Sequence, residues 1–306
     1  MIDTNQEEHY IKRGDPTKPT YYIIRPKYAG SGLFYHFSTI AGYILYALSK
    51  DWLPVVDMQN YPNAYLAPEK LGKENSWEYY LEQPLRIGLE EAYNGENIVL
   101  NSQNKRIPYP DTFMSLYENK NNELTEWRML VKLGLLKIKP ELMQEIAAVR
   151  QKLFAPNDRV LGVLLRGTDY VANRPRSHPI PPPTEFAASM VVNKVQEWKC
   201  NKIFLATEDK NIVQAFKQVF GDFCITFNRE YVDYKVGQSI SLVRIDREND
   251  HFLQGKDYLT QMVLLTMCNS LVSARCFGSV GAMIIADNFD HTYFFNLGRY
   301  GVISLD

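Results

Sequence analysis

The segment Gly162–Tyr170 constrains the fold more than any other part of this sequence. Its apolar, β-prone run Gly-Val-Leu-Leu ends abruptly in the charged, glycine-containing turn Arg-Gly-Thr-Asp-Tyr. This pattern is typical of an open parallel sheet, in which ligands bind just beyond the carboxyl ends of the strands. A second strand with a polar tip, Ile203–Asp209, follows later in the chain. Two such strand ends predict a site for a phosphorylated, ribose-bearing ligand, although Arg166 and Asp169 could also form an ordinary surface pair.

The same alternation of strand, turn and helix occurs on both sides of Ala155–Asp158. Before this turn, strand Tyr21–Arg25, helix Leu33–Lys50 and strand Trp52–Asp57 are expected to form a β-α-β unit. After it, four expected strands alternate with helices: Val160–Leu165, Lys202–Ala206, Cys224–Thr226 and Ser270–Ala274. A length of 306 residues suits two domains. We therefore predict an α/β protein with two Rossmann-type, doubly wound domains that face each other across a cleft.

The predicted boundaries follow from polar and proline-rich stretches. Residues 1–19 are read as a polar tail, 20–155 as an N-terminal α/β domain, and 156–306 as a C-terminal α/β domain. The first residues lack the apolar core of a signal peptide, and no apolar run reaches the roughly 20 residues needed to span a bilayer. Four cysteines without metal-ligand spacing indicate reduced thiols. These features predict a cytoplasmic protein without a transmembrane segment, and they leave peripheral membrane contact open.

The net charge of the chain argues against one class of partner, the nucleic acids. The formal net charge is −1 and the isoelectric point is near 6.5, whereas a nucleic-acid-binding domain is usually strongly basic. We therefore expect no nucleic-acid partner. The sequence also lacks a P-loop, a D-x-D motif at a strand end, a G-x-S-x-G elbow and H-E-x-x-H. Elimination favours chemistry in which a phosphate group leaves, assisted by arginine and backbone N–H groups without a metal ion.

Two glycine-containing turns are candidates for binding phosphate. Gly30, Ser31 and Gly32 separate a strand from a helix, and bare backbone N–H groups at a helix start favour anions. The alternative is a structural tight turn. Phe277, Gly278 and Ser279 also open a helix after a strand, with Ser279 as either an N-cap or a phosphate donor. Close packing of helix on sheet explains this second turn nearly as well.

Five side chains are candidates for the chemistry itself: Arg166, His36, Asp169, His178 and Asp209. Arg166 offers a planar fork of donors that matches phosphate oxygens, and it can neutralise charge as a diphosphate leaves. Thr168 and Asp169 can cap the same turn. His36, on the first turn of the expected helix, and His178 could act as bases near neutral pH, as could Asp169 and Asp209.

At these residues the chain resembles the fucosyltransferase superfamily, most closely the α1,6- and nodulation fucosyltransferase branch. More distant similarity connects it to the protein-O- and α1,2-fucosyltransferases. Leu165–Asp169 with His178–Ile180 resembles the family motif H-x-R-R-T-D followed by H-P-I, and Ile203–Asp209 resembles V-Y-L-A-T-D-D. Further resemblance lies in Leu264–Ser279, in Gly30–Gly32 with His36, and in Asp57–Asn60. The similarity thins between residues 61 and 155.

The resemblance implies a GT-B-type, metal-independent, inverting transfer from a GDP-sugar, typically GDP-fucose, with no other cofactor. Arg166 matches the arginine that binds the β-phosphate. The remaining residues implied to bind the donor are Thr168, His178, Thr207, Glu208, Asp209, Asp257, Gln261, Phe277, Gly278 and Ser279, together with Gly30, Ser31 and Gly32.

The chain also departs from the family pattern. The family histidine before the arginine is Leu164 here, its second arginine is Gly167, and the lysine after the aspartate is Tyr170. The glutamate base of the α1,6 branch falls on Arg174. The acidic residue that reads guanine aligns with Gln261, although Asp257 lies one helical turn earlier.

We interpret the sequence as a glycosyltransferase that moves a sugar, fucose first, to a glycan or glycolipid acceptor in surface polysaccharide synthesis. Two alternatives stay open. The first is a transferase with another nucleotide-sugar donor, and the second is a catalytically inactive glycan-binding protein of the same fold.

Overall fold

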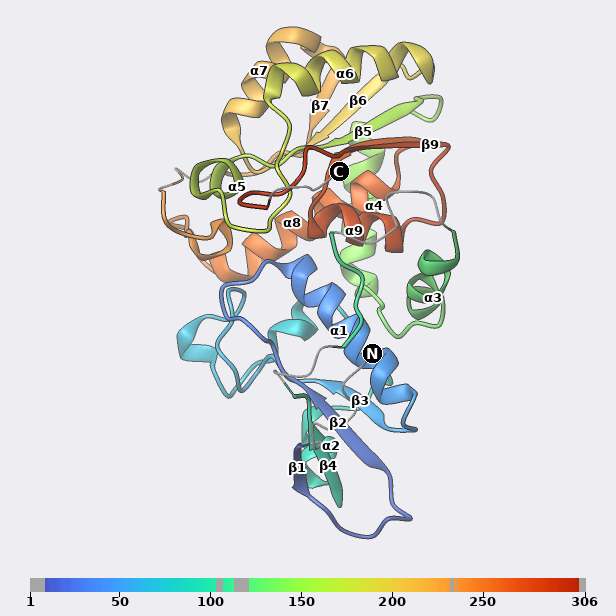
Figure 1. The fold of residues 1–306 in the computed structure, drawn as a ribbon, viewed down its shortest axis with the longest axis vertical. Coiled ribbons are helices and arrows are strands. Elements are labelled where there is room, and N and C mark those ends of the chain that lie inside the picture. Colours follow the sequence, from blue (N-terminus) through green and yellow to red (C-terminus); the bar gives the residue numbers. More distant parts are fainter. Residues whose placement is uncertain (1–8, 103–106, 113–120, 232–233, 235, 303–306) are drawn as a thin grey trace.

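The computed structural model describes residues 9–102, 107–112, 121–231, 234 and 236–302. Two sheets lie at opposite ends of the molecule, with helices between them (Figure 1). The first sheet has the order β1-β4-β2-β3, and the second has the order β7-β6-β5-β8-β9. This mixed α/β architecture with two sheets confirms the predicted fold class.

The N-terminal sheet is parallel except at one edge. Strands β2 (Thr20–Ile24), β3 (Leu53–Val56) and β4 (Asn97–Leu100) run parallel, whereas β1 (His9–Lys12) pairs with β4 in the antiparallel direction. Residues 9–12, which were predicted to belong to the polar tail 1–19, thus form an edge strand, while residues 1–8 lie outside the described part. An edge strand needs few apolar residues, and here Tyr10 anchors it by packing edge-on against Trp52, with 6.2 Å between ring centroids.

The C-terminal sheet is parallel throughout. Its strands are β5 (Val160–Leu164), β6 (Lys202–Ala206), β7 (Cys224–Thr226), β8 (Ser270–Ala274) and β9 (His291–Phe295). The chain runs outward from β5 through β6 to β7 and then returns to the other side of β5 with β8. The strand order thus reverses beside β5, which is where open α/β sheets hold their ligands.

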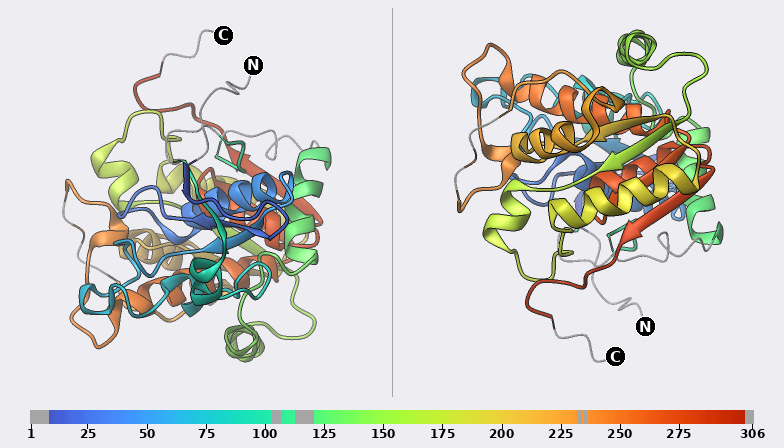
Figure 2. Two further views of the ribbon diagram at one scale, coloured as in Figure 1. Left: turned by 90° about the horizontal axis from the view of Figure 1, so that it is seen from below. Right: turned by 90° about the horizontal axis from the view of Figure 1, so that it is seen from above.

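Helices cover both faces of the C-terminal sheet. Helices α6 (Thr184–Glu197) and α7 (Lys210–Phe220) lie on the outer face, away from the N-terminal half (Figures 1 and 2). Helices α8 (Asp250–Thr266) and α9 (Phe277–Ile285) lie on the inner face. The short helix α5 (Thr168–Asn173) follows β5 directly. This places the start of α5, α8 and α9 around one end of the sheet.

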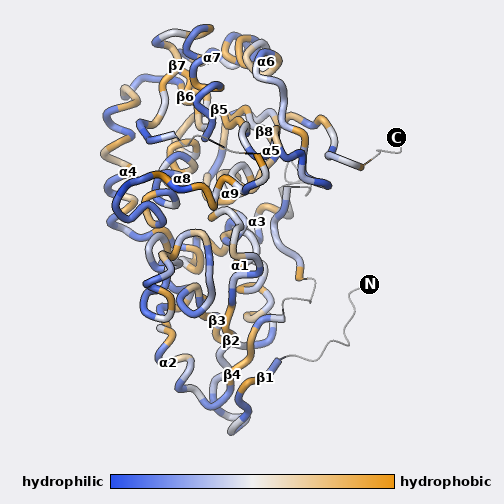
Figure 3. Tube along the Cα trace, turned by 90° about the vertical axis from the view of Figure 1, so that its left-hand side faces the viewer, coloured by the Kyte–Doolittle hydropathy of each residue, from blue (hydrophilic) through white to orange (hydrophobic). Residues whose placement is uncertain are grey.

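The two halves share one hydrophobic core. Helix α1 (Leu33–Leu48) and α9 are apolar nearly all round, which is the pattern of a buried helix, and they pack against each other between the sheets. One cluster of buried side chains runs from Tyr22 of β2 through these helices to Phe204 of β6. Figure 3 shows hydrophobic residues along β2 and around α9.

The helices before the predicted boundary at residue 155 reach into the C-terminal half. Besides α2 (Leu89–Asn94), the N-terminal part has α3 (Asn121–Lys132) and α4 (Pro140–Leu153). The Nε of Arg128 in α3 donates to the carbonyl of Met283 in α9 at 3.0 Å. Glu145 of α4 pairs with Lys256 of α8 at 2.5 Å. The boundary at 155 itself stays a prediction.

Candidate active site

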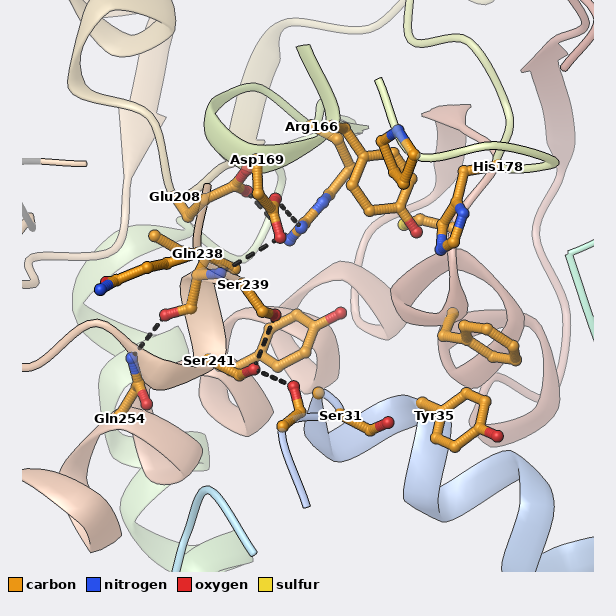
Figure 4. A pocket seen from close by; sticks show the side chains of 18 of the residues that line it. Ser31, Tyr35, Arg166, Asp169, His178, Glu208, Gln238, Ser239, Ser241 and Gln254 are labelled. Carbon is orange, nitrogen blue, oxygen red and sulfur yellow. Dashed lines mark hydrogen bonds and ion pairs between the residues drawn. The ribbon is translucent and has the colours of Figure 1, made fainter. Parts of the chain in front are cut away.

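A cavity of about 470 Å³ opens at the carboxyl ends of β5, β6 and β8. Its walls come from both halves of the chain. Ser31 and Tyr35 lie at the start of α1, and across the cavity lie Arg166, Asp169 and His178 (Figure 4). Because the strand order reverses beside β5, the cavity occupies the position that the fold favours for a ligand.

Arg166 is held between two carboxylates. Its Nη2 lies 2.9 Å from Oδ1 of Asp169, and its Nη1 lies 3.3 Å from Oε2 of Glu208. All three side chains are almost buried. Burial by itself would lower the pKa of Arg166, but the carboxylates of Glu208 and Asp169 raise this pKa well above its usual range. The guanidinium is therefore permanently charged, and the three side chains together carry one excess negative charge.

The turn between β5 and α5 fits tightly against the end of β6. A Cβ atom on Gly167 would collide with the side chain of Asp209, whose own Cβ would lie 2.8 Å away, so a larger residue would displace Asp209. The Gly167 N–H and the Thr168 hydroxyl both donate to Oε1 of Glu208 at 3.0 Å. Thr168 also has a φ of +40°, a conformation that costs energy for a residue with a side chain. Glu208 thus fixes the turn as well as Arg166.

Thr168 and Asp209 lie on a second cavity of about 880 Å³, which shares Arg166 and Glu208 with the first. Asp209 caps α7 by accepting from the N–H of Asn211 at 2.8 Å. Its other oxygen accepts from the N–H of Thr168 at 3.3 Å. Neither residue is among the described residues that line the first cavity. The structure therefore gives them positions beside the predicted site, with Asp209 in a structural role.

A loop that the sequence analysis missed closes one side of the first cavity. Oδ2 of Asp169 accepts from the N–H of Ile240 at 3.1 Å, and the Ser241 hydroxyl donates to the carbonyl of Gly30 at 2.5 Å. Residues 237–241 therefore connect the β5–α5 turn to the glycine loop of the N-terminal half (Figure 4). This loop has no hydrophobic periodicity, so the sequence carried no signal for its position.

The glycine loop lines the cavity as predicted, through Gly30, Ser31 and Gly32. Two of its neighbouring N–H groups are already bonded within the chain. The Ser31 N–H donates to the carbonyl of Tyr28 at 3.2 Å, and the Leu33 N–H donates to the Tyr65 hydroxyl at 2.5 Å. Fewer backbone donors are consequently directed at a ligand than the sequence pattern predicts.

His36 does not reach the cavity. Its side chain is fully buried, and it is not among the described lining residues. Burial lowers the pKa of its imidazole to about 4, against a smaller opposite effect of the Ser31 backbone. The imidazole is thus neutral and enclosed at pH 7. The structure places the preceding residue, Tyr35, on the cavity wall instead.

Of the donor-binding residues predicted after β6 and on α8, some line the cavity and one does not. Thr207 and Gln261 line the cavity, and Nε2 of Gln261 donates to the carbonyl of Thr207 at 3.3 Å. Asp257 instead pairs with Arg247 at 3.1 Å and is not among the described lining residues. A second arginine, Arg229, lines the cavity and donates to Oε1 of Gln261 at 3.1 Å. Arg229 is not among the residues predicted from the sequence.

The start of α9 contributes one of its three predicted residues. Phe277 lines the cavity, whereas Ser279 is buried and caps the helix by bonding the N–H and carbonyl of Cys276. Gly278 allows α9 to approach α8, since a Cβ there would lie 2.7 Å from the Tyr258 hydroxyl. Ser279 therefore caps the helix, and Gly278 has a packing role against α8 rather than against the sheet.

Aromatic rings form the wall beside Phe277. Tyr35 meets Phe277 edge-on, with 5.0 Å between ring centroids, and Tyr28 lies 6.0 Å from Tyr35. The exposed His178 lies edge-on to Tyr170 at 5.4 Å. The Tyr170 ring also lies under the guanidinium of Arg166 at 4.7 Å, which contributes a cation–π contact to the same cluster.

No helix in the described part of the chain is long and apolar enough to cross a membrane. Among the same residues, no group of three or more histidine, cysteine, aspartate or glutamate side chains is arranged to hold a metal ion.

Comparison with known proteins connects this chain to others through structure alone. No family model and no curated protein matches the sequence. Among solved structures, NodZ α-1,6-fucosyltransferase soaked with GDP-fucose matches with a TM-score of 0.54 and 13% identity, over 93% of this chain and 98% of that one. The fold is that of the fucosyltransferases.

Two more solved structures share the fold of this chain. Fucosyltransferase NodZ from Bradyrhizobium has a TM-score of 0.53 and 16% identity, over 94% of this chain and 98% of that one. A mutant of FUT1 from Arabidopsis thaliana in complex with GDP has a TM-score of 0.53 and 11% identity, over 94% of this chain and 72% of that one. These matches confirm the GT-B-type fold predicted from the sequence, which this chain shares with the fucosyltransferase structures.

Proposed function

We propose that this chain is a metal-independent, inverting glycosyltransferase that moves a sugar from a GDP-sugar, GDP-fucose first, to a hydroxyl of a glycan. The observation that carries the proposal is the position of Arg166. It is held at the carboxyl ends of β5 and β6 on a cavity of about 470 Å³, in a fold shared with structures that contain GDP-fucose and GDP. A permanently charged fork at this point suits a departing diphosphate.

In the proposed reaction, the acceptor oxygen attacks the anomeric carbon from the face opposite the diphosphate. The new carbon–oxygen bond forms as the bond to the β-phosphate oxygen breaks, and GDP leaves with the electron pair. The hydroxyl proton passes to a base on the cavity wall. Of the bases that the sequence predicted, Asp169 and His178 line the cavity, whereas His36 is buried and Asp209 caps a helix.

In this proposal each half of the chain binds a different substrate. The C-terminal half, residues 156–306, holds the nucleotide, and the N-terminal half, residues 20–155, presents the acceptor. The aromatic wall of Tyr28 and Tyr35 on the N-terminal side suits a sugar, because aromatic faces pack against the apolar C–H face of a pyranose ring. The acceptor class would be a glycan or glycolipid used in surface polysaccharide synthesis in the cytoplasm.

The first experiment measures binding of GDP, UDP and CMP by calorimetry, followed by hydrolysis and transfer assays with GDP-fucose in the presence and absence of EDTA. Micromolar binding of GDP and EDTA-resistant turnover support the proposal. Preference for UDP or CMP would retain the fold and overturn the donor. Complete loss of turnover in EDTA, restored by Mg²⁺ or Mn²⁺, would contradict the metal-free reaction.

A substitution of Arg166 tests its role. Arg166→Lys keeps the charge beside Asp169 and Glu208 but removes the planar fork, so the fold should survive better than with alanine. We expect kcat/KM for transfer to fall by about 10²-fold, the scale of one lost transition-state donor. Arg86→Gln, on an exposed side chain outside the cavity, is the control. Turnover near the wild-type rate in Arg166→Lys would remove Arg166 from the mechanism.

A catalytically inactive glycan-binding protein is the second candidate function. The observation that favours it is the pairing of Arg166 with two carboxylates, which leaves less of its charge for a diphosphate. In that case glycans would bind to the purified protein, while GDP binding, donor hydrolysis and transfer would all be absent.

A further inference from the structure

Arg229 differs in charge environment from the other arginine on the cavity wall. Its Nη1 donates to Oε1 of Gln261 at 3.1 Å, its Nε donates to the backbone carbonyl of Glu230 at 3.3 Å, and its guanidinium lies 5.8 Å from the Tyr231 ring. Each of these partners is neutral. Within the described residues, no carboxylate lies within ion-pair distance of Arg229, whereas Arg166 has two.

Both guanidinium groups are linked to residues that follow β6. Gln261, which holds Arg229, also donates to the carbonyl of Thr207 at 3.3 Å, and the next residue, Glu208, pairs with Arg166. Both arginines line the same cavity, and its described lining residues include no lysine. The carboxylates of Asp169 and Glu208 outweigh the charge of Arg166 locally. An anion that enters the cavity is therefore attracted more strongly to Arg229 than to Arg166.

We propose that Arg229, held by the neutral amide of Gln261, is an anion-binding residue that contacts the diphosphate of the bound nucleotide. This inference rests on the proposed function and deepens it. Gln261 orients the guanidinium of Arg229, and because its amide is neutral it does not cancel the charge of the arginine. Arg166, on the same cavity, then contacts the diphosphate as charge develops during departure of the leaving group.

The first test is binding of GDP and of inorganic pyrophosphate to wild-type protein, Arg229→Gln and Arg86→Gln. A lost charge-assisted hydrogen bond weakens binding by about 10-fold or more. We expect Arg229→Gln to raise Kd for both probes by this factor and to reduce the salt dependence of binding. Arg86→Gln removes the same charge at an exposed side chain and should bind like wild type. Unchanged binding in Arg229→Gln would overturn the inference.

A second variant, Gln261→Glu, distinguishes two roles of position 261, because each role predicts an opposite change in GDP binding. A carboxylate at position 261 would pair with Arg229 and cancel its charge, so we expect weaker binding of both GDP and pyrophosphate. If position 261 instead reads guanine through an acidic group, as the family resemblance implies, the same variant would bind GDP more tightly. Tighter GDP binding by Gln261→Glu would therefore contradict the role of Arg229.

These results separate the inference from the proposed function. Wild-type protein that binds GDP and transfers fucose, with Arg229→Gln unchanged, keeps the function and rejects the inference. Wild-type protein that binds pyrophosphate through Arg229 but has no transferase activity keeps the anion site and rejects the function. Wild-type protein that binds neither probe contradicts both.

Discussion

The buried imidazole of His36 connects the stability of the protein to pH. It lies between the rings of Tyr35 and Tyr65, and burial lowers its pKa from 6.5 to about 4. The unfolded chain therefore binds more protons than the folded chain between these two values. The stabilising effect of a neutral His36 is complete above the unfolded pKa and is lost as the pH falls through this window. The loss amounts to at most about 3 kcal/mol.

Urea denaturation at several pH values checks this expectation. The free energy of unfolding of wild-type protein should fall as the pH decreases from about 7 to about 4.5, and His36→Asn should show a shallower dependence. His178→Asn is the matched control, because His178 is exposed. An identical pH dependence in wild type and His36→Asn would show that His36 does not titrate in this range.

Single residues were predictable from sequence where a strand end fixed their position. Arg166 lies two residues after β5 and Thr207 follows β6 directly, so the sheet itself brings them to the cavity. His36 was placed wrongly because successive helical residues point in directions about 100° apart, so the face of Tyr35 is not the face of His36. Arg229 was missed because its loop has no periodic pattern and its partner Gln261 is distant in sequence.

At the scale of elements, α1 and α9 pack closely because Gly281 of α9 has no side chain. A Cβ on Gly281 would lie 2.0 Å from Cδ1 of Phe34, whose ring also packs edge-on against Tyr258 at 5.2 Å. We expect Gly281→Ala to lower the free energy of unfolding by about 1–3 kcal/mol, the usual cost of overpacking a core.

A double-mutant cycle isolates this contact. Phe34→Leu makes room for the added methyl group, so Gly281→Ala should cost less in the Phe34→Leu background than in wild type. Urea denaturation of the four proteins measures the difference. Strictly additive effects would mean that Phe34 is not the side chain that excludes a larger residue at position 281.

The elements that were predicted well from the sequence are the buried ones, because burial requires a pattern of apolar residues. Strands β5 and β6 are buried along most of their length and read as continuous apolar runs, and α1 is apolar over most of its length, apart from His36, Ser38 and Thr39. Strand β1 has only one half-buried side chain, Tyr10, so its residues resemble a polar tail. Its pairing with β4 depends on backbone hydrogen bonds, which leave no trace in residue type.

At the scale of the whole molecule, the cavity is bounded by both halves while the core beneath it is continuous. Tyr22 of the N-terminal sheet and Phe204 of the C-terminal sheet belong to one cluster of buried side chains, joined through α1, α8 and α9. Alternation of strands and helices revealed two sheets in the sequence. This alternation could not reveal that the helices between the sheets form a shared core. The sequence of a buried helix has the same apolar pattern whichever element packs against it.

This shared core predicts that the protein unfolds as one unit, although two-domain chains of this length commonly do not. Neither half can lose its fold without exposing the apolar faces of α1 and α9. Calorimetry should give equal calorimetric and van't Hoff enthalpies, and variants that retain only Trp77 or only Trp198 should report the same midpoint. These two buried tryptophans lie in the N-terminal and C-terminal halves respectively. Two resolved transitions would show instead that the halves are independent domains joined by a weak interface.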